Sequence, residues 1–479
     1  MSDGSTSDAE ESPVSTTRLS ALDASFLEVE SATAHMHVGW AATFTPPQDA
    51  QRPDFDELLH HIAARIGRAP RYRQRLAPVP FGVHEPEWTD HDDFDAAEHV
   101  RASDAEQLDE LVADVLSRPL ARDRPLWELW IADGLADGRI GMVGKAHHCM
   151  VDGIAAVELS TMLLDPEEHP RSAQPDGWRA SPAPGPLALL GRGLIDRARE
   201  QLDLVRAPLG ALTSPGRLLS VPGHAVRTAQ AVGDALIPSA SETPFNEPSS
   251  PHRHLATLHR PLIELRRVKS RFGVTVNDVV LAACAGAIRE FLVARGHEPV
   301  RLKTMVPVNV RNGGADELGN RISFMFVGLP CDEPDPLMRL FSVNHQTSAR
   351  KRGGVPEEAD VVMRAAGYAP MPVQRVLSHL IASPRTFNLV ISNIPGPRIP
   401  LYLRGCRLEE AYPVVPLSDR HAVSIGMMTV GDDACFGLYA DRETLPDAAV
   451  LAERLDAAIN ELLDLLKAIA RRSLLGTRG

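Results

Sequence analysis

The stretch KAHHCMVDGIAAVELSTMLL, residues 145–164, decides how the chain is interpreted. The residues before the histidines, RIGMVGKA, are typical of a β-strand, whereas GIAAVELSTMLL is typical of a helix. His147, His148 and Asp152 therefore lie at a predicted strand-to-helix turn, where functional groups are exposed on a rigid frame. A neutral imidazole can accept a proton from an alcohol or an amine near neutral pH, because the ordinary pKa of histidine is about 6.5.

Three roles are open for this histidine pair: general base, metal ligand or structural residue. Adjacent residues of a strand point to opposite faces, which suits one reactive imidazole better than two ligands of the same metal ion. The sequence therefore favours a general base, and we expect no metal site. Asp152 is expected to fix the turn or orient the base. Gly153 removes a side chain where a substrate must approach.

Composition excludes several classes of function. The 479 residues exceed what one hydrophobic core usually organises, so we expect two domains. Hydrophobic residues make up 44% of the chain and charged residues 24%, as in ordinary globular proteins. The formal net charge of −13 argues against nucleic acid as a partner. The five cysteines are far apart and form no CxxC pair, which fits a reducing cytoplasm better than a zinc site or a disulfide framework.

The boundaries of the predicted domains follow from places where the strand and helix patterns of the sequence are interrupted. Residues 1–18 are acidic and rich in Ser and Thr, so we expect a disordered tail and neither a signal peptide nor a membrane anchor. Proline-rich breaks near residues 181 and 238 bracket a linker at 181–252. Strand and helix patterns alternate on both sides of it, which predicts an α/β fold with an N-terminal domain at 19–180 and a C-terminal domain at 253–479.

The linker region is locally basic and amphipathic in an otherwise acidic chain. Residues 187–237 are rich in both leucine and arginine and contain only four acidic residues. Two interpretations are compatible: a helical linker packed on the domains, and a surface that contacts anionic lipid. No stretch approaches eighteen uninterrupted apolar residues, so we expect a soluble or peripheral protein without a spanning helix.

Local signals also place individual elements. PDFDELLHHIAARIG predicts a helix capped by Asp54. VTVNDVVLAACAGAIREFLVARG predicts a second helix, with Thr275 or Asn277 as its cap and Gly296 at its end. Strands are predicted for RLKTMVPVNVR, RISFMFVGLP, TFNLVISNIPGP and AVSIGMMTV.

Further motifs occur in order along the chain: WTDHDDFDAAEHVR (88–101), RPLWELWIADGLADGR (124–139), HHCMVDG, VNDVVLA (276–282), PVNVR with LGNRIS (307–323), and SNIPGP (392–397). Together they resemble the bacterial wax ester synthase/acyl-CoA:diacylglycerol acyltransferases, which belong to the CoA-dependent acyltransferase superfamily with chloramphenicol acetyltransferase and peptide-synthesis condensation domains. The resemblance covers nearly the whole chain. HHxxxDG alone identifies only the superfamily, whereas the PLW, ND and SNIPGP stretches indicate the neutral-lipid family.

The resemblance implies two chloramphenicol-acetyltransferase-like domains that form a substrate tunnel between them. His148 matches the family's catalytic histidine, so it would deprotonate the acceptor hydroxyl, which attacks the thioester of acyl-CoA directly; His147 would support it. No cofactor is expected, because acyl-CoA is a substrate. The tetrahedral intermediate carries a negatively charged oxygen that needs hydrogen-bond donors to stabilise it. Asn277 is the first candidate donor, and its alternative role is a helix cap. The other implied site residues are Ser392 and Asn393 (further oxyanion candidates, or turn residues), Asp278 of the ND motif, Pro125, Leu126 and Trp127 on the tunnel wall, and Arg311 as the ion-pair partner of Asp152.

Three functions follow as alternatives. The first is esterification of a long-chain acyl group onto diacylglycerol or a fatty alcohol. The second keeps the fold but acylates a polyketide or another secondary-metabolite hydroxyl. The third is a catalytically silent lipid-binding or lipid-droplet protein, against which the intact HHxxxDG motif argues. For the first we expect acyl-CoA and lipid alcohols as partners, and a cytoplasmic protein held peripherally at a membrane or lipid droplet.

Overall fold

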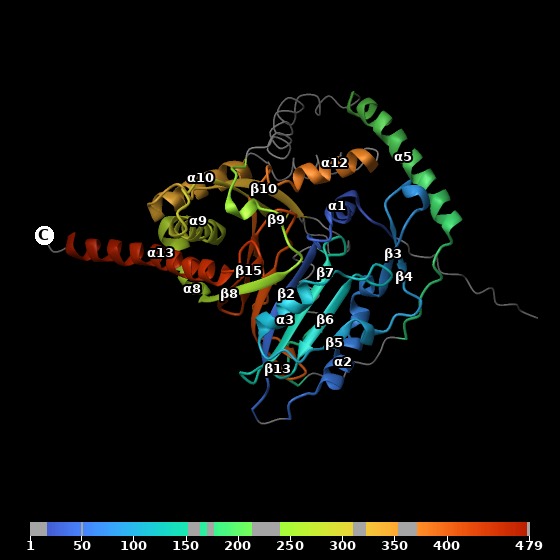
Figure 1. The fold of residues 1–479 in the computed structure, drawn as a ribbon, viewed down its shortest axis with the longest axis horizontal. Helices are drawn as coiled ribbons and strands as arrows, with labels where there is room; N and C mark the ends of the chain where they lie inside the picture. The colour runs from blue at the N-terminus through green and yellow to red at the C-terminus, as the bar shows by residue number, and fades with distance from the viewer. Residues whose placement is uncertain are drawn as a thin grey trace, which may run out of the picture.

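The structure of this chain is a computed structural model built around two six-stranded β-sheets (Figure 1). It describes residues 17–48, 51–151, 163–169, 177–212, 240–309, 322–352 and 371–476. Strands and helices occur together in both halves of the chain, so the α/β architecture with two sheet-based halves that the sequence predicted is observed.

The first sheet is built mainly from the N-terminal half. Its pairs are antiparallel, except for the parallel pair at the edge formed by residues 100–102. In spatial order its strands are β12 (Tyr402–Leu403), β13 (Cys406–Val414), β2 (His37–Thr45), β7 (Ile140–His147), β6 (Trp127–Ala132) and β5 (Val100–Ala102). A small sheet lies beside it, with the order β1 (Thr17–Arg18), β4 (Glu87–Asp90) and β3 (Gln74–Ala77).

The second sheet belongs to the C-terminal half. Its strands in spatial order are β10 (Ile322–Leu329), β9 (Leu302–Asn309), β11 (Leu389–Ile394), β14 (Val423–Val430), β15 (Asp433–Asp441) and β8 (Arg253–Pro261). The central strand β11 runs parallel to both of its neighbours, and the other pairs are antiparallel.

Helices cover the two sheets, and each half has its own apolar core. In the N-terminal half these are α1 (Ala21–Val29), α2 (Phe55–Ala63) and α3 (Leu108–Leu116). In the C-terminal half they are α8 (Leu262–Phe272), α9 (Val276–Ala294), α10 (Pro336–Arg352), α12 (Met371–Ile381) and α13 (Ala448–Gly476). Helices α8, α9, α10 and α13 gather on one side of the molecule, whereas α12 lies near α1, against which it packs (Figure 1). The long helix α5 (Pro186–Leu212) runs along the outer edge of the N-terminal half.

The predicted helix caps are present. The side chain of Asp54 accepts from the backbone N–H of Glu57 at the start of α2, and Glu57 reaches back to the N–H of Asp54. Thr275 caps α9 in the same reciprocal way with Asp278, so Thr275 and not Asn277 is the cap. These bonds satisfy N–H groups that the first turn of a helix leaves without a partner.

The two halves are joined by a strand crossover. Strands β12 and β13 follow β11 in sequence but leave its sheet: β13 pairs with β2 of the N-terminal sheet, and β12 pairs with β13 at the edge. Residues 402–414 of the predicted C-terminal domain therefore belong to the N-terminal sheet. The crossover requires glycine on the strands it passes, because a Cβ on Gly437 would lie 2.4 Å from the carbonyl oxygen of Pro413 and one on Gly426 would lie 2.7 Å from the Pro413 ring.

Candidate active site

The first of the two adjacent histidines, His147, ends β7 in the middle of the N-terminal sheet, and His148 lies in the turn that follows. The backbone N–H of His147 donates to the carbonyl of Leu126, and that of His148 donates to the carbonyl of Met36, both at 2.9 Å. These two hydrogen bonds fix the end of β7 to the neighbouring segments at Leu126 and at Met36. The His147 side chain is fully buried, whereas that of His148, in the turn beyond the strand, lines a cavity.

The cavity that contains His148 has a volume of about 250 Å³ and lies where the two halves meet. The N-terminal half contributes His148, one side of α1 and the start of β2. The C-terminal half contributes strands β9, β10 and β11, the end of α12 and the loop after β13. Most of the wall is apolar, and a few polar side chains interrupt it. An apolar cavity with few convergent polar groups is the usual form of a site for a lipid-like ligand.

The imidazole of His148 is stacked on the ring of Phe26. The two ring centroids are 3.8 Å apart and the planes differ by 5°. Phe26 comes from α1, and it also lines the cavity. Parallel stacking at this distance restricts rotation of the imidazole about its bond to Cβ, so α1 sets the plane of the proposed base.

His147 has a packed, neutral environment. Its Nδ1 accepts a hydrogen bond from the backbone N–H of Cys149 (3.1 Å), which leaves the proton on Nε2. Nε2 lies 3.8 Å from Oε1 of Glu30, and that carboxylate pairs with Arg122. Burial, together with the charges of Arg122 and His148, holds the pKa of His147 well below its ordinary value. His147 therefore stays uncharged near neutral pH, as a supporting residue would.

Ser392 and Asn393 reach the same cavity from the C-terminal sheet. They lie near the end of β11, in the strand rather than in a turn. The loop that follows packs closely on β14, because a Cβ on Gly396 would lie 2.0 Å from the carbonyl oxygen of Thr429. The SNIPGP sequence thus fixes the end of β11, and the structure brings His148, Ser392 and Asn393 to one cavity although about 245 residues separate them in sequence.

The ND motif lies at the start of α9. Asp278 is buried, and its carboxylate accepts hydrogen bonds from the Thr275 N–H (2.8 Å), the Asn344 amide (2.9 Å) and the Thr347 hydroxyl (2.7 Å). Burial opposes its charge, but these bonds hold the pKa of Asp278 below its ordinary value. A carboxylate engaged in this way stabilises the helix start. Asp278 does not line the described cavity, and its role in substrate binding stays a prediction. Asn277 is half-buried beside it and does not line the described cavity; its role as oxyanion donor stays a prediction.

The PLW motif lies in the N-terminal core and not on the wall of the His148 cavity. Pro125, Leu126 and Trp127 are buried. The indole N–H of Trp127 donates to the carbonyl of Tyr72 (2.8 Å), and its ring stacks on His99. Such a residue organises the core, so the predicted position on the tunnel wall is not found in the described structure.

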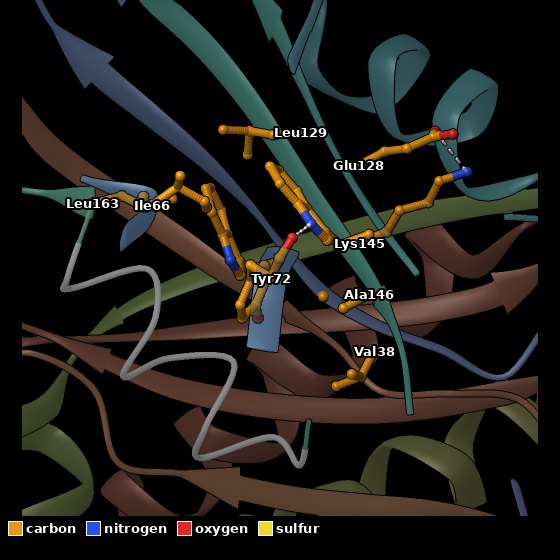
Figure 2. A pocket seen from close by; sticks show the side chains of 12 residues that line it. Val38, Ile66, Tyr72, Glu128, Leu129, Lys145, Ala146 and Leu163 are labelled. Carbon is orange, nitrogen blue, oxygen red and sulfur yellow. Dashed lines mark hydrogen bonds and ion pairs between the residues drawn. The ribbon is translucent and has the colours of Figure 1, made fainter. Parts of the chain in front are cut away.

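Trp127 does line a second, much smaller pocket of about 30 Å³ (Figure 2). The Nζ of Lys145 lies at one edge of it, 3.3 Å from Glu128, and donates to the carbonyls of Val115 and Arg118 at the end of α3. The pocket has room for about one water molecule. Lys145 holds the C-terminal end of α3, where a cation is favourable, and the pocket has no space for a substrate.

Three predicted site residues, Asp152, Gly153 and Arg311, lie outside the described residues. The predicted Asp152–Arg311 ion pair stays a prediction for the same reason.

Sequence patterns did not single out Phe26 or the inner face of α12. LSALDASFLEVE places Phe26 three residues after Asp23, a helix-start residue that bonds Ser20. An aromatic side chain on a short capped helix was the available signal, but nothing local relates it to a histidine 122 residues later.

Two features are absent from the residues that the structure describes. No group of three or more His, Cys, Asp or Glu side chains there is arranged to hold a metal ion. No helix there combines the length and the apolar character needed to span a membrane.

Fold and site together define a two-domain acyltransferase-like protein with a histidine at the interdomain cavity, and comparison with known proteins makes the class specific. Residues 19–280 match the wax ester synthase/diacylglycerol acyltransferase catalytic domain, and residues 318–463 match the WS/DGAT C-terminal domain. The chain belongs to this family, which confirms the resemblance drawn from its motifs.

Similar curated proteins include two from Mycobacterium tuberculosis. The chain is 33% identical to the probable diacylglycerol O-acyltransferase tgs1, over 96% of this chain and 98% of that protein. It is 32% identical to the probable diacylglycerol O-acyltransferase tgs2, over 92% of this chain and 97% of that protein.

Solved structures support the predicted fold class. A wax ester synthase/diacylglycerol acyltransferase from Marinobacter aquaeolei VT8 superposes with a TM-score of 0.65 at 26% identity, covering 93% of this chain and 98% of that chain. The first condensation domain of the calcium-dependent antibiotic synthetase superposes with a TM-score of 0.58 at 16% identity, covering 95% and 97%. The second match concerns the fold alone.

Proposed function

We propose that this protein transfers a long-chain acyl group from acyl-CoA to the hydroxyl of diacylglycerol, of a long-chain fatty alcohol, or of both. The observation that carries the proposal is the position of His148 on the wall of a mostly apolar cavity where the two halves meet. Family membership and the names of the mycobacterial relatives support the same reaction and the same acceptors.

In the proposed reaction His148 acts as general base. Its imidazole takes the proton of the acceptor hydroxyl as the oxygen attacks the thioester carbonyl carbon. The tetrahedral intermediate collapses, the carbon–sulfur bond breaks, and the CoA thiolate takes the proton back from the imidazolium. No acyl-enzyme forms, and the proposed chemistry needs no resident cofactor.

The remaining residues would position and stabilise. Ser392 and Asn393 lie on the same cavity wall and are our candidates for donating hydrogen bonds to the developing oxyanion, a contribution that is often the largest in acyl transfer. Phe26 would set the imidazole plane. Burial of the acyl chain in the apolar cavity would supply about 0.8 kcal/mol per methylene.

A lipid acceptor requires access to a lipid phase, so we propose that the protein works while bound peripherally to a membrane or lipid droplet in the cytoplasm. The absence of a candidate spanning helix from the described residues is compatible with such binding.

The reaction is tested by competition. Purified protein receives one labelled long-chain acyl-CoA with diacylglycerol, hexadecanol, short alcohols and polyketide alcohols together, and the products are separated by chromatography. Triacylglycerol or wax ester as the main product is expected. Esters of added polyketide alcohols alone, or no ester with any acceptor, would contradict the proposal in favour of a secondary-metabolite acyltransferase or a silent lipid-binding protein.

A further inference from the structure

Large apolar side chains that are exposed in the described part of the chain are concentrated at one edge of the molecule. Most of them lie on α5, on α12, or on the turn at Pro80–Gly82 against which α5 packs. Helices α5 and α12 run along the same side of the molecule as α1 (Figure 1). These side chains are Phe81, then Leu187, Leu194, Ile195 and Leu202 on α5, and Val373, Val376 and Leu380 on α12.

Helix α12 has an inner face that lines the cavity and an outer face that is exposed. Ser378 and Ile381 on its inner face line the His148 cavity. Val373, Val376 and Leu380 are spaced at i, i+3 and i+7, so they form one outward stripe, and Val376 is 58% exposed. One helix thickness therefore separates the cavity from an apolar surface that faces outward.

The segment that contains α12 carries only positive formal charges. Residues 371–400 contain three arginines and no Asp or Glu, in a chain whose net charge is −13. Arg375 and Arg385 are exposed, and Arg375 contributes an ion pair with Glu28 that connects α12 to α1. An apolar stripe bordered by cations is complementary to a lipid surface with anionic headgroups.

Helix α5 is amphipathic with its polar face turned inward. Asp196 pairs with Arg18 (2.8 Å), Glu200 lies 3.2 Å from a ring nitrogen of His84, and Arg197 pairs with Glu200 (3.1 Å). The opposite face, from Leu187 to Leu202, carries the exposed leucines and isoleucine. A helix at the surface of a globular domain normally has the reverse arrangement.

We propose that the outer faces of α5 and α12 form a docking surface for a lipid bilayer with anionic headgroups, and that the lipid acceptor reaches the His148 cavity past α12. This inference rests on the proposed function for the lipid acceptor and for peripheral binding, and it adds which surface of the protein docks. Because α5 uses several of its charged side chains for contacts within the protein, apolar contact contributes more to docking than charge, so salt weakens binding without abolishing it.

The test compares three substitutions of exposed apolar residues. Val376→Glu lies on α12 and Leu194→Glu on α5, and neither residue lines the cavity. Val293→Glu is the matched control, because Val293 is 46% exposed on α9, a helix that lies with α8 and α13 on the side of the molecule away from α5 (Figure 1). Thermal unfolding is measured first to verify that each variant is folded.

Binding is measured by flotation with vesicles of phosphatidylcholine and phosphatidylglycerol, and with vesicles of phosphatidylcholine alone. Turnover is measured with diacylglycerol in the mixed vesicles and with a short water-soluble alcohol. We expect Val376→Glu and Leu194→Glu each to weaken vesicle binding about tenfold, as loss of one buried aliphatic side chain should. Diacylglycerol turnover should fall in parallel, turnover of the short alcohol should stay at the wild-type level, and Val293→Glu should behave as wild type.

Wild-type vesicle binding by both variants, or an equal loss in Val293→Glu, would overturn the docking surface. Loss of short-alcohol turnover with unchanged vesicle binding would also overturn it, because α12 would then act only by shaping the cavity. If the wild type binds vesicles through these residues but esterifies neither acceptor, docking stands and the proposed function fails.

Discussion

The ring of Phe26 lies parallel to the imidazole of His148, with the centroids 3.8 Å apart and the planes 5° from parallel. The contact joins a short helix near the N-terminus to the turn that follows β7, a central strand of the N-terminal sheet. Since a general base must present its lone pair along the direction of the proton it removes, a fixed ring plane would contribute directly to the proposed reaction.

Phe26 is therefore expected to be a positioning residue. Phe26→Ala should lower kcat by about 10- to 100-fold, because a misplaced catalytic group loses alignment without losing its chemistry. The KM for acyl-CoA should change little, and Phe26→Tyr should restore most of kcat because it keeps the stacked ring. Steady-state kinetics of the two variants measure this split. A folded Phe26→Ala protein with wild-type kcat would show that the stack only packs α1.

His147 is expected to contribute stability and not proton transfer. His147→Ala leaves the N–H of Cys149 without its acceptor and creates a small cavity, so the free energy of unfolding should fall by about 1–3 kcal/mol. Most of the activity should remain in the folded fraction. Urea unfolding measures the free energy of unfolding, and a turnover assay of the same variant measures the remaining activity. Near-complete loss of activity in a protein of wild-type stability would place His147 in the chemistry.

The end of β11 is expected to stabilise the oxyanion. Ser392→Ala or Asn393→Ala, whichever removes the donor, should lower kcat by about 10²–10³ with acyl-CoA binding retained. Ser418→Ala is the matched control, because Ser418 also lines the cavity but lies in the loop after β13. Equal and small effects in all three variants would show that neither Ser392 nor Asn393 is the donor, and Asn277 would then be the leading candidate.

Asp278 is expected to stabilise the start of α9 in a pH-dependent way. Asp278→Asn weakens the bonds to Thr275 and Thr347 and should cost about 1–3 kcal/mol near pH 7. Because the folded state lowers the pKa of this carboxyl, its contribution is present above the ordinary value of about 4 and is lost as the pH falls through the folded pKa.

The unfolding free energies of wild type and Asp278→Asn should therefore converge as the solution is acidified. Chemical unfolding across the acidic range measures this convergence. A fully stable Asp278→Asn protein that no longer binds acyl-CoA would support the substrate-binding role that the motif implied.

Features that depend on local sequence could be predicted. The caps of α2 and α9 follow from Asp54 and Thr275 with an acidic residue three positions later, since both partners lie within one helical turn. The end of strand β7 at the histidines follows from the change of pattern after RIGMVGKA, since His147 is its last residue and His148 lies in the turn beyond it. Both predictions need only a few consecutive residues.

Features that depend on contacts between distant parts of the chain could not be predicted from the sequence. Strand β13 joins the N-terminal sheet by pairing residues 407–414 with residues 39–45, and periodicity carries no information about the partner. The linker pattern predicted an amphipathic helix, but which face of α5 turns outward is decided by Arg18 and His84, more than a hundred residues upstream. The stack of Phe26 on His148 was missed for the same reason.

The central claim is that His148 is the base of an acyl transfer, and the most direct measurement is the turnover of His148→Ala with labelled acyl-CoA and diacylglycerol. The account predicts a protein that unfolds like the wild type and binds acyl-CoA, but whose turnover is lower by about 10² to 10⁴, the usual contribution of a positioned base. Wild-type activity should itself fall on acidification, because a protonated imidazole has no lone pair with which to accept a proton. Near wild-type turnover in a folded His148→Ala protein would contradict the mechanism.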